Sequence, residues 1–91
     1  MAKHRSCTDI AADVIKAAIG GATKTRILYA AGLSTNNLTK YVSLLVGSGL
    51  LELEPVNRRY SPTEKGATFL QIYEETVTMA EIIEVIKKGE S

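Results

Sequence analysis

This chain lacks several features on which common protein classes depend. It has one cysteine, one histidine and no tryptophan among its 91 residues. The single thiol, Cys7, cannot form an internal disulfide, and with His4 it offers only two of the four ligands of a tetrahedral zinc site. No apolar run approaches the roughly 20 residues of a membrane helix, and the polar start MAKHRSC is unlike a signal peptide. We therefore expect a cytoplasmic protein with no metal and no other cofactor, and leave a redox role of Cys7 open.

Catalytic motifs are also missing. No glycine-rich phosphate loop occurs, and the pair Gly20-Gly21 is typical of a turn. Cys7 has no structured partner base, because His4 lies on the same short N-terminal arm. The glutamate pairs at 74–75 and 81/84 follow one helical stretch and imply no pocket. The sequence therefore predicts that the protein is not an enzyme.

Charge is small in total but unevenly distributed. The net charge is +1, yet residues 1–62 hold eight basic and four acidic side chains, whereas residues 63–91 hold three lysines and six glutamates. A hydrophobic fraction of 45% is typical of an ordered globular chain. A basic body with an acidic C-terminal segment favours contact with DNA on one side only, through a modest and salt-dependent attraction.

Three short helices are predicted in the first half of the chain. After a basic arm of residues 1–7, Thr8 is expected to cap a helix that stops at Gly20-Gly21. Thr23 caps a second helix that Gly32 ends, and Ser34 caps a third, which spans 34–46. A short helix, a Gly-Leu-Ser break and an amphipathic helix form the pattern of a helix-turn-helix, which places one helix in the major groove of DNA. The buried positions expected in these helices are Ile10, Val14, Ile15, Ala18, Ile19, Ile27, Leu28, Ala30, Ala31, Leu38, Tyr41, Val42 and Leu45.

A β-hairpin and a long helix are predicted to follow. The stretch 50–54 alternates apolar and charged residues, Pro55-Val56-Asn57 has turn chemistry, and Arg58 to Ser61 returns as the partner strand. Thr63 caps a last helix that could run to Lys88. The expected fold class is mainly α with a small β-hairpin wing: a winged helix-turn-helix plus a long C-terminal dimerisation helix. Its expected parts are a flexible basic arm (1–7), a winged helix-turn-helix body (8–62) and the long helix that completes the body and dimerises (63–91).

The last helix is too long for a body of this size. Twenty-six residues span about 39 Å, and the apolar side chains repeat at alternating spacings of three and four, as in a coiled coil. One apolar seam can pack on the body, but residues beyond about 78 have nothing of their own chain to cover them. We therefore expect a homodimer through this helix. The predicted interface residues are Ile72, Thr76, Met79, Ile82, Ile83 and Ile86.

Candidate DNA contacts come from three places. The outer face of helix 34–46 carries amide, hydroxyl and amino groups suited to base edges: Thr35, Asn36, Asn37, Thr39, Lys40 and Ser43. Lys24 and Arg26 lie in the first turn of the second helix, where phosphates are commonly bound, and Arg58 and Arg59 lie near the tip of the wing. Because side chains alternate along a strand, the two arginines are not both expected to face DNA. For each of these groups the alternative is an ordinary solvated surface. For the N-terminal residues Lys3, His4 and Arg5 two interpretations are open, a minor-groove arm or a disordered basic start.

The chain resembles a known family. The run KTRILYAAGLSTNNLTKYVSLLVGSGLLE, followed by YSPTEKGATFLQIYE, is similar to small archaeal winged-helix DNA-binding proteins, a group that includes the ten-kilodalton dimeric chromatin-type proteins of the Sulfolobales. The resemblance covers about residues 8–75. It implies dimers joined by an antiparallel coiled coil of the C-terminal helices. Relatives often have aromatic or basic residues where this chain has Thr35, Asn36 and Asn37, which favours a selective regulator over general chromatin coating.

Three functions are consistent with these features. The leading hypothesis is a homodimeric winged-helix transcriptional regulator that reads the major groove of double-stranded DNA with helix 34–46. The alternatives are a protein-interaction module, which the near-neutral net charge favours, and a non-specific protein of nucleoid architecture. The first and third would place the protein at the nucleoid.

Overall fold

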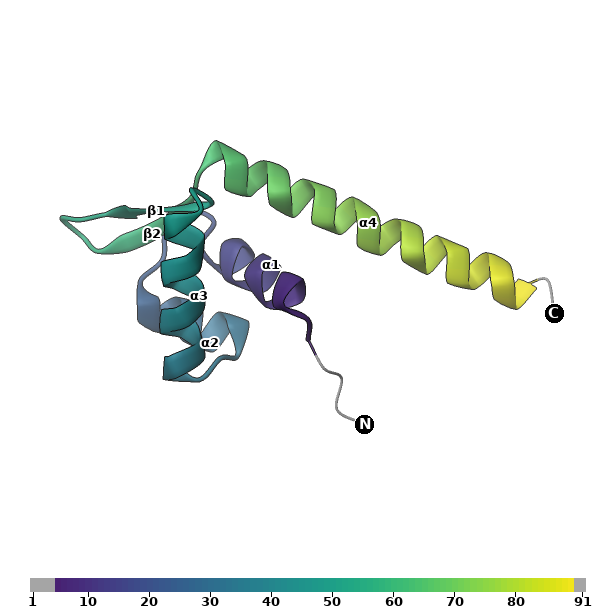
Figure 1. Cartoon of the computed structure of the whole chain (residues 1–91), viewed down its shortest axis with the longest axis horizontal. Helices are drawn as coiled ribbons and strands as arrows, with labels where there is room; N and C mark the ends of the chain where they lie inside the picture. The colour runs from purple at the N-terminus through teal and green to yellow at the C-terminus, as the bar shows by residue number, and fades with distance from the viewer. Residues whose placement is uncertain (1–4, 90–91) are drawn as a thin grey trace.

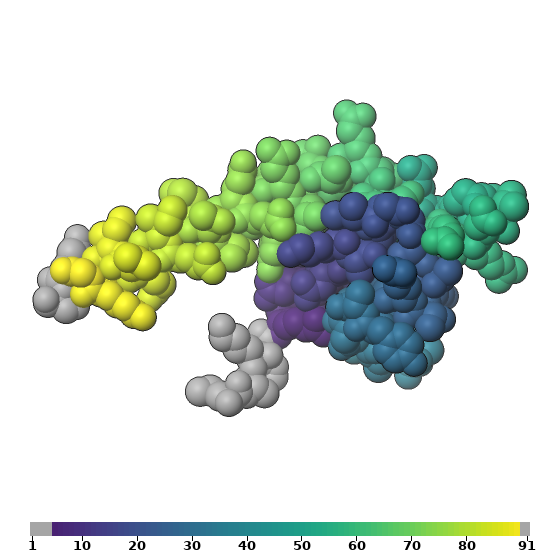
Figure 2. Space-filling view, turned by 180° about the vertical axis from the view of Figure 1, so that it is seen from behind, coloured from purple at the N-terminus to yellow at the C-terminus, as the bar shows by residue number. Residues whose placement is uncertain are grey.

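The computed structural model describes residues 5–89 and contains four helices and one hairpin within that range (Figure 1). The elements are α1 (Cys7–Ala17), α2 (Lys24–Ala31), α3 (Thr35–Gly47), β1 (Leu51–Glu54), β2 (Arg59–Pro62) and α4 (Glu64–Gly89). The first three helices pack into a body, the hairpin projects from it, and α4 crosses it and extends well beyond (Figures 1 and 2). The predicted fold class, mainly α with a hairpin wing and a long last helix, is confirmed.

Helix α1 begins earlier than the sequence pattern indicates. Ser6, not Thr8, is the N-cap: its hydroxyl accepts from the Asp9 N–H at 3.1 Å, and the Asp9 carboxylate accepts from the Ser6 N–H at 3.0 Å. This reciprocal capping box satisfies two backbone donors and outweighs a lone threonine cap. Ser6 and Cys7 therefore belong to the start of the helix rather than to an arm. The predicted contacts of Lys3 and His4 lie outside the described residues.

The core lies where α1, α2 and α3 meet beneath β1 and the start of α4. Its fully buried side chains include Val14, Ile15 and Ile27, and the predicted inward stripe of α3 is buried throughout. Two expected core positions are wrong. Ile19 is 60% exposed because α1 ends at Ala17, and Ala30 is exposed on the outer side of α2. For Ile19 the predicted spacing continued past the end of the helix, and for Ala30 it extended past the arc that the neighbouring helices cover.

The hairpin is antiparallel, with Leu53 opposite Tyr60 and Glu54 opposite Arg59. Tyr60 also exchanges two backbone hydrogen bonds with Ala22, so β2 has a partner on each side. The prediction that the second strand begins at Arg58 is wrong. Arg58 belongs to the turn, and its φ of +53° lies in the left-handed region. The Glu54 carboxylate accepts from the Asn57 and Val56 N–H groups at 2.9 and 2.7 Å, and these bonds hold the pKa of Glu54 below its ordinary value.

The start of α4 is fixed against the loop that precedes β1. Thr63 caps the helix by accepting from the Gly66 N–H at 3.0 Å, and the Thr63 backbone N–H donates to the Leu50 carbonyl at 3.1 Å. Gly66 itself is buried against that carbonyl: a Cβ placed there would lie 2.0 Å from the Leu50 oxygen. No side chain larger than hydrogen fits, so this glycine sets how closely α4 approaches the body.

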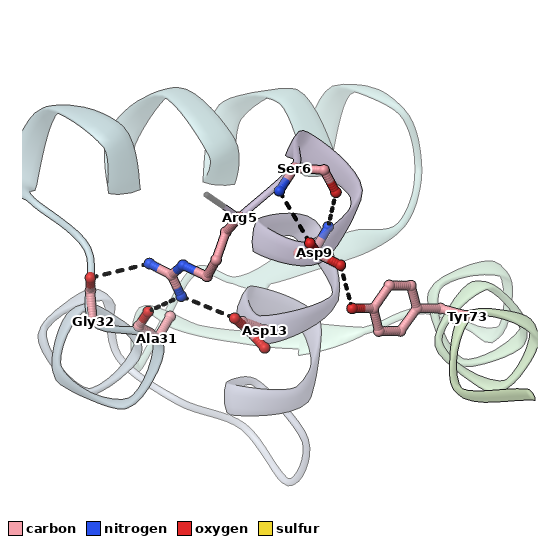
Figure 3. Close-up of polar contacts among 7 residues, drawn as sticks. All are labelled: Arg5, Ser6, Asp9, Asp13, Ala31, Gly32 and Tyr73. Carbon is pink, nitrogen blue, oxygen red and sulfur yellow. Dashed lines mark hydrogen bonds and ion pairs between the residues drawn. The ribbon is translucent and has the colours of Figure 1, made fainter. Parts of the chain in front are cut away.

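Polar and aromatic contacts then fix the direction of α4 across α1. Leu70 is buried, and Phe69 and Tyr73, whose rings are 6.5 Å apart, are half-buried. The Tyr73 hydroxyl donates to the Asp9 carboxylate (Figure 3), and Lys16 pairs with Glu74 at 3.6 Å. The body therefore packs on one side of the first part of α4. Further along, α4 leaves the body, and Ile72, Met79, Ile82, Ile83 and Ile86 are each about half exposed.

The Asp9–Tyr73 contact predicts a specific pH dependence. The bond from Tyr73, followed by those from Ser6, holds the pKa of Asp9 below its ordinary 3.8, while the carboxylate raises the pKa of Tyr73 to about 12. A lowered carboxylate pKa contributes stability that is present above about pH 4 and is lost as the pH falls further. A raised tyrosine pKa contributes stability that is lost as the pH rises from about 10 towards 12. We expect Tyr73→Phe to lower the melting temperature at neutral pH and to flatten both limbs of its pH profile.

Tyr29→Phe is the matched control, because Tyr29 is 78% exposed and its hydroxyl bonds to no other residue within 5–89. Its melting curve should follow the parent chain at every pH. Identical profiles for Tyr73→Phe and the parent chain would mean that the Asp9 contact does not contribute to stability in solution.

Candidate nucleic-acid interface

The outer face of α3 is fully open to solvent. Ser34 caps the helix through the Asn37 N–H, and Gly32 ends α2 with a left-handed φ of 64°, so the two helices meet at a tight turn. Burial of Leu38, Tyr41, Val42 and Leu45 turns the opposite side of α3 outward. All six predicted base-reading residues lie exposed on it: Thr35, Asn36, Asn37, Thr39, Lys40 and Ser43. The Lys40 ammonium lies 5.8 Å from the centre of the Tyr41 ring, so its position is partly set by a cation–π contact.

The turn before α3 is held from the N-terminal side by Arg5 (Figure 3). Its guanidinium donates to the Ala31 carbonyl at 2.8 Å, to the Gly32 carbonyl at 3.2 Å and to the Asp13 carboxylate at 2.9 Å. These carbonyls end α2 and have no partner within the helix, so a cation there is favourable. Arg5 thus supports the helix-turn-helix from within the body. Sequence reasoning placed it on a mobile arm, because a contact across 26 residues leaves no local signal.

A groove runs between α3 and the wing, with the start of α2 at its base. Two adjoining hollows share Lys24, Leu53 and Tyr60. The first is also lined by Thr23, Thr25, Pro55 and Arg58, and the second by Val42, Ser43, Val46 and Gly47. The lining combines two cations, four hydroxyl groups and an apolar wall, and it contains no carboxylate. Such a surface suits an anionic backbone with apolar sugar rings.

The wing separates its charges by face. Leu53 and Tyr60 form a cross-strand pair on the side of the groove, whereas Glu52, Glu54, Arg59 and Ser61 alternate onto the other side. Arg59 extends towards the turn between α1 and α2, where its guanidinium donates to the Gly21 carbonyl at 3.5 Å. The structure thus brings Lys24 and Arg58 together and leaves Arg59 outside the groove. That the two arginines do not both face DNA remains a prediction.

Sequence reasoning missed several residues of the groove. Thr23 was interpreted as a helix cap and Leu53 and Tyr60 as strand residues, and Thr25 was not singled out. The strand alternation could have placed Leu53 and Tyr60 on one face, but only the fold brings that face opposite α3. Neither Lys24 nor Arg58 pairs with an acidic group among residues 5–89, so both cations are available to a ligand.

Other kinds of site have little support in the part of the chain that the structure describes. It contains no group of three or more His, Cys, Asp or Glu side chains that could hold a metal ion. Its helices also include none with the length and apolar character needed to cross a bilayer. Cys7 is a free, exposed thiol, and its contact with the hydroxyl of Tyr41, together with burial of that ring, raises the pKa of Tyr41.

Three packed helices, the second and third joined by a tight turn and followed by a hairpin that flanks the third, define a winged helix-turn-helix protein. The chain belongs to the winged helix-turn-helix family, whose model matches residues 4–81. Among solved structures it is similar to Sso10a-2, a DNA-binding protein from Sulfolobus solfataricus, with 29% sequence identity and a TM-score of 0.81 over 93% of this chain and 92% of the other. No curated protein matches the chain. The resemblance to small archaeal winged-helix DNA-binding proteins is therefore confirmed.

Proposed function

We propose that the protein binds double-stranded DNA as a homodimer and acts as a transcriptional regulator. The observation that carries the proposal is the groove between α3 and the wing, where Lys24 and Arg58 lie together in a lining that contains no carboxylate. The family and the similarity to a DNA-binding protein support the DNA-binding part of the proposal. The protein would then reside with the DNA, in the cytoplasm.

Each part of the interface has a distinct role in this proposal. The outer face of α3 enters the major groove, where the amides of Asn36 and Asn37 suit adenine and Lys40 suits guanine or a phosphate. The groove holds one strand of the backbone, with phosphates on Lys24 and Arg58 and a sugar against Leu53 and Tyr60. Arg26 is exposed in the first turn of α2 and adds a third phosphate contact.

The exposed apolar side chains of α4 support the proposed dimerisation. Five large apolar side chains lie about half exposed there, on one seam that the body does not cover: Ile72, Met79, Ile82, Ile83 and Ile86. With Thr76, they form the proposed interface with the α4 helix of a second copy. Two bodies at the ends of such a helix pair would contact separate half-sites, whose spacing the dimer geometry sets.

The polar character of α3 favours a regulator over a general chromatin protein. Lys40 is the only cation on its outer face, so sequence-independent attraction through this helix is small, whereas amides and hydroxyls offer directional hydrogen bonds to bases. The second candidate, a protein-interaction module, is favoured by the near-neutral net charge of +1.

The test is a salt titration of fluorescence anisotropy with the intact protein. We expect Lys24→Gln and Arg58→Gln each to weaken binding, because each removes a cation that would neutralise one phosphate. The slope of log K against log salt should become shallower by about 0.9 for each such phosphate. Lys88→Gln makes the same charge change near the far end of α4 and should leave the slope unchanged.

Two duplexes separate the candidate functions. Preference of about 10³-fold or more for a duplex from the protein's own promoter over a random one would support a selective regulator. Equal affinity for both would favour an architectural role or a regulator of other sites. Absence of binding to either duplex at low salt would contradict DNA binding and favour the protein-interaction module.

A further inference from the structure

The tip of the wing, residues 55–58, carries an exposed apolar side chain that the contacts proposed above do not use. Val56 is 86% exposed, the largest exposed fraction of any large apolar side chain among residues 5–89. The hairpin that carries it is narrow and projects from the body (Figures 1 and 2). Val56 therefore lies at the end of a projecting hairpin, where it can enter a narrow groove that the rest of the domain does not enter.

The tip is held in one conformation. The Glu54 carboxylate accepts from the backbone N–H groups of Val56 and Asn57 at 2.7 and 2.9 Å, and these two hydrogen bonds stabilise the turn. Pro55 fixes its own φ, and Arg58 adopts a left-handed φ of 53° before the second strand begins. An apolar side chain on a preorganised turn loses little conformational entropy when it is buried by a partner.

The charges around the tip limit how the hairpin can meet DNA. Arg58 lies two residues from Val56 and makes no ion pair within the described chain, so a cation that can hold a phosphate lies beside the tip. Glu52 lies further back along the hairpin, on the face turned away from the groove, and the Glu54 carboxylate is held at the base of the tip by the N–H groups of Val56 and Asn57. Both carboxylates would oppose deep burial of the whole hairpin between phosphates. Contact through the tip alone would bring Val56 to the DNA without burying the whole hairpin between phosphates.

We infer that Val56 is a wedge that enters the minor groove beside the site of α3, partly separates two stacked base pairs and bends the DNA, while Arg58 keeps the phosphate contact proposed above. This inference rests on the proposed DNA binding. Proteins that insert apolar side chains in this way bend the duplex by roughly 20–90°, and they favour the flexible steps TA and CA/TG. The residue would thus confer a sequence preference without hydrogen bonds to a base edge.

The experiment measures end-to-end FRET of a duplex, together with anisotropy, at saturating protein. Val56→Thr keeps the shape and β-branching of the side chain but adds a hydroxyl, so the hairpin should fold unchanged, which a melting curve checks. Val85→Thr makes the same change on α4, at a side chain that is 69% exposed and outside the proposed dimer seam. We expect the parent chain and Val85→Thr to raise FRET and to prefer a duplex with TA steps beside the binding site over one with an A-tract there.

Val56→Thr should still bind with an unchanged salt slope, but it should lose most of the FRET change and the preference for TA steps. Two results would overturn the wedge while leaving DNA binding intact: an unbent duplex with the parent chain, or the same bend with Val56→Thr. Failure of the parent chain to bind any duplex would instead overturn the proposed function, and the wedge with it.

Discussion

Replacing Gly66 by alanine is expected to destabilise the protein by about 3 kcal/mol, because the new methyl group has no space. The added Cβ would lie 2.0 Å from the Leu50 carbonyl oxygen, an atom of the backbone that cannot rotate away. The same carbonyl accepts from the Thr63 N–H, so any displacement of α4 also strains its N-terminal cap. For a domain of this size the melting temperature should fall by roughly 10–20 °C, measurable by circular dichroism.

Gly47→Ala is the matched control for this prediction. Gly47 is the last residue of α3, its φ is not left-handed, and a Cβ there meets nothing within 4 Å. Alanine at such a position should be neutral or stabilising by up to about 1 kcal/mol. A Gly66→Ala variant as stable as the parent chain would show that α4 can leave the Leu50 carbonyl at no cost.

The second large effect is expected at the proposed dimer seam. Ile83→Glu places a carboxylate at the middle of the exposed apolar stretch of α4, where pairing with a second copy would bury it without a partner. Because Ile83 is not part of the core, the body should stay folded. Sedimentation at tens of micromolar should then show a monomer in place of a dimer. Loss of two-site engagement should weaken binding to a duplex with two half-sites by roughly 10²-fold or more.

Two further variants separate the seam from a simple effect of charge. Val85→Glu adds the same charge at an exposed apolar residue outside the seam, and Ile83→Leu keeps the seam apolar. Both should remain dimers. A monomeric parent chain under these conditions, or a dimeric Ile83→Glu, would contradict the role assigned to this part of α4.

The exposed polar face of α3 was predictable because its signals are local. Ser34 and Gly32 mark the ends of neighbouring helices, and the spacing of Leu38, Tyr41, Val42 and Leu45 alone determines which side of α3 turns outward. All six polar residues expected on that side are exposed. The cap of α1 was misplaced because Thr8 and Ser6 are both good capping residues, and Asp9 decides between them by completing a capping box.

The groove could not be predicted, because its residues come from three separate segments. Lys24, Val42 and Tyr60 belong to α2, α3 and β2, and no periodicity within one segment reports on another. The direction of Arg59 likewise depends on the Gly21 carbonyl, 38 residues earlier in the chain. Sequence patterns indicated that the two arginines would not both face DNA, but not that Arg58 would line the groove and Arg59 would not.

By itself, the sequence determined the order and kind of the elements, the inward stripes of its helices and the excess of apolar surface on the last helix. These properties follow from caps, turns and periodicities that act over a few residues. Only the tertiary structure decided that Arg5 braces the helix-turn-helix, that Asp9 anchors Tyr73 across 64 residues, and that Gly66 must lack a side chain. The physical reason is that hydrogen bonds and close approaches between distant segments exist only after packing has brought those segments together.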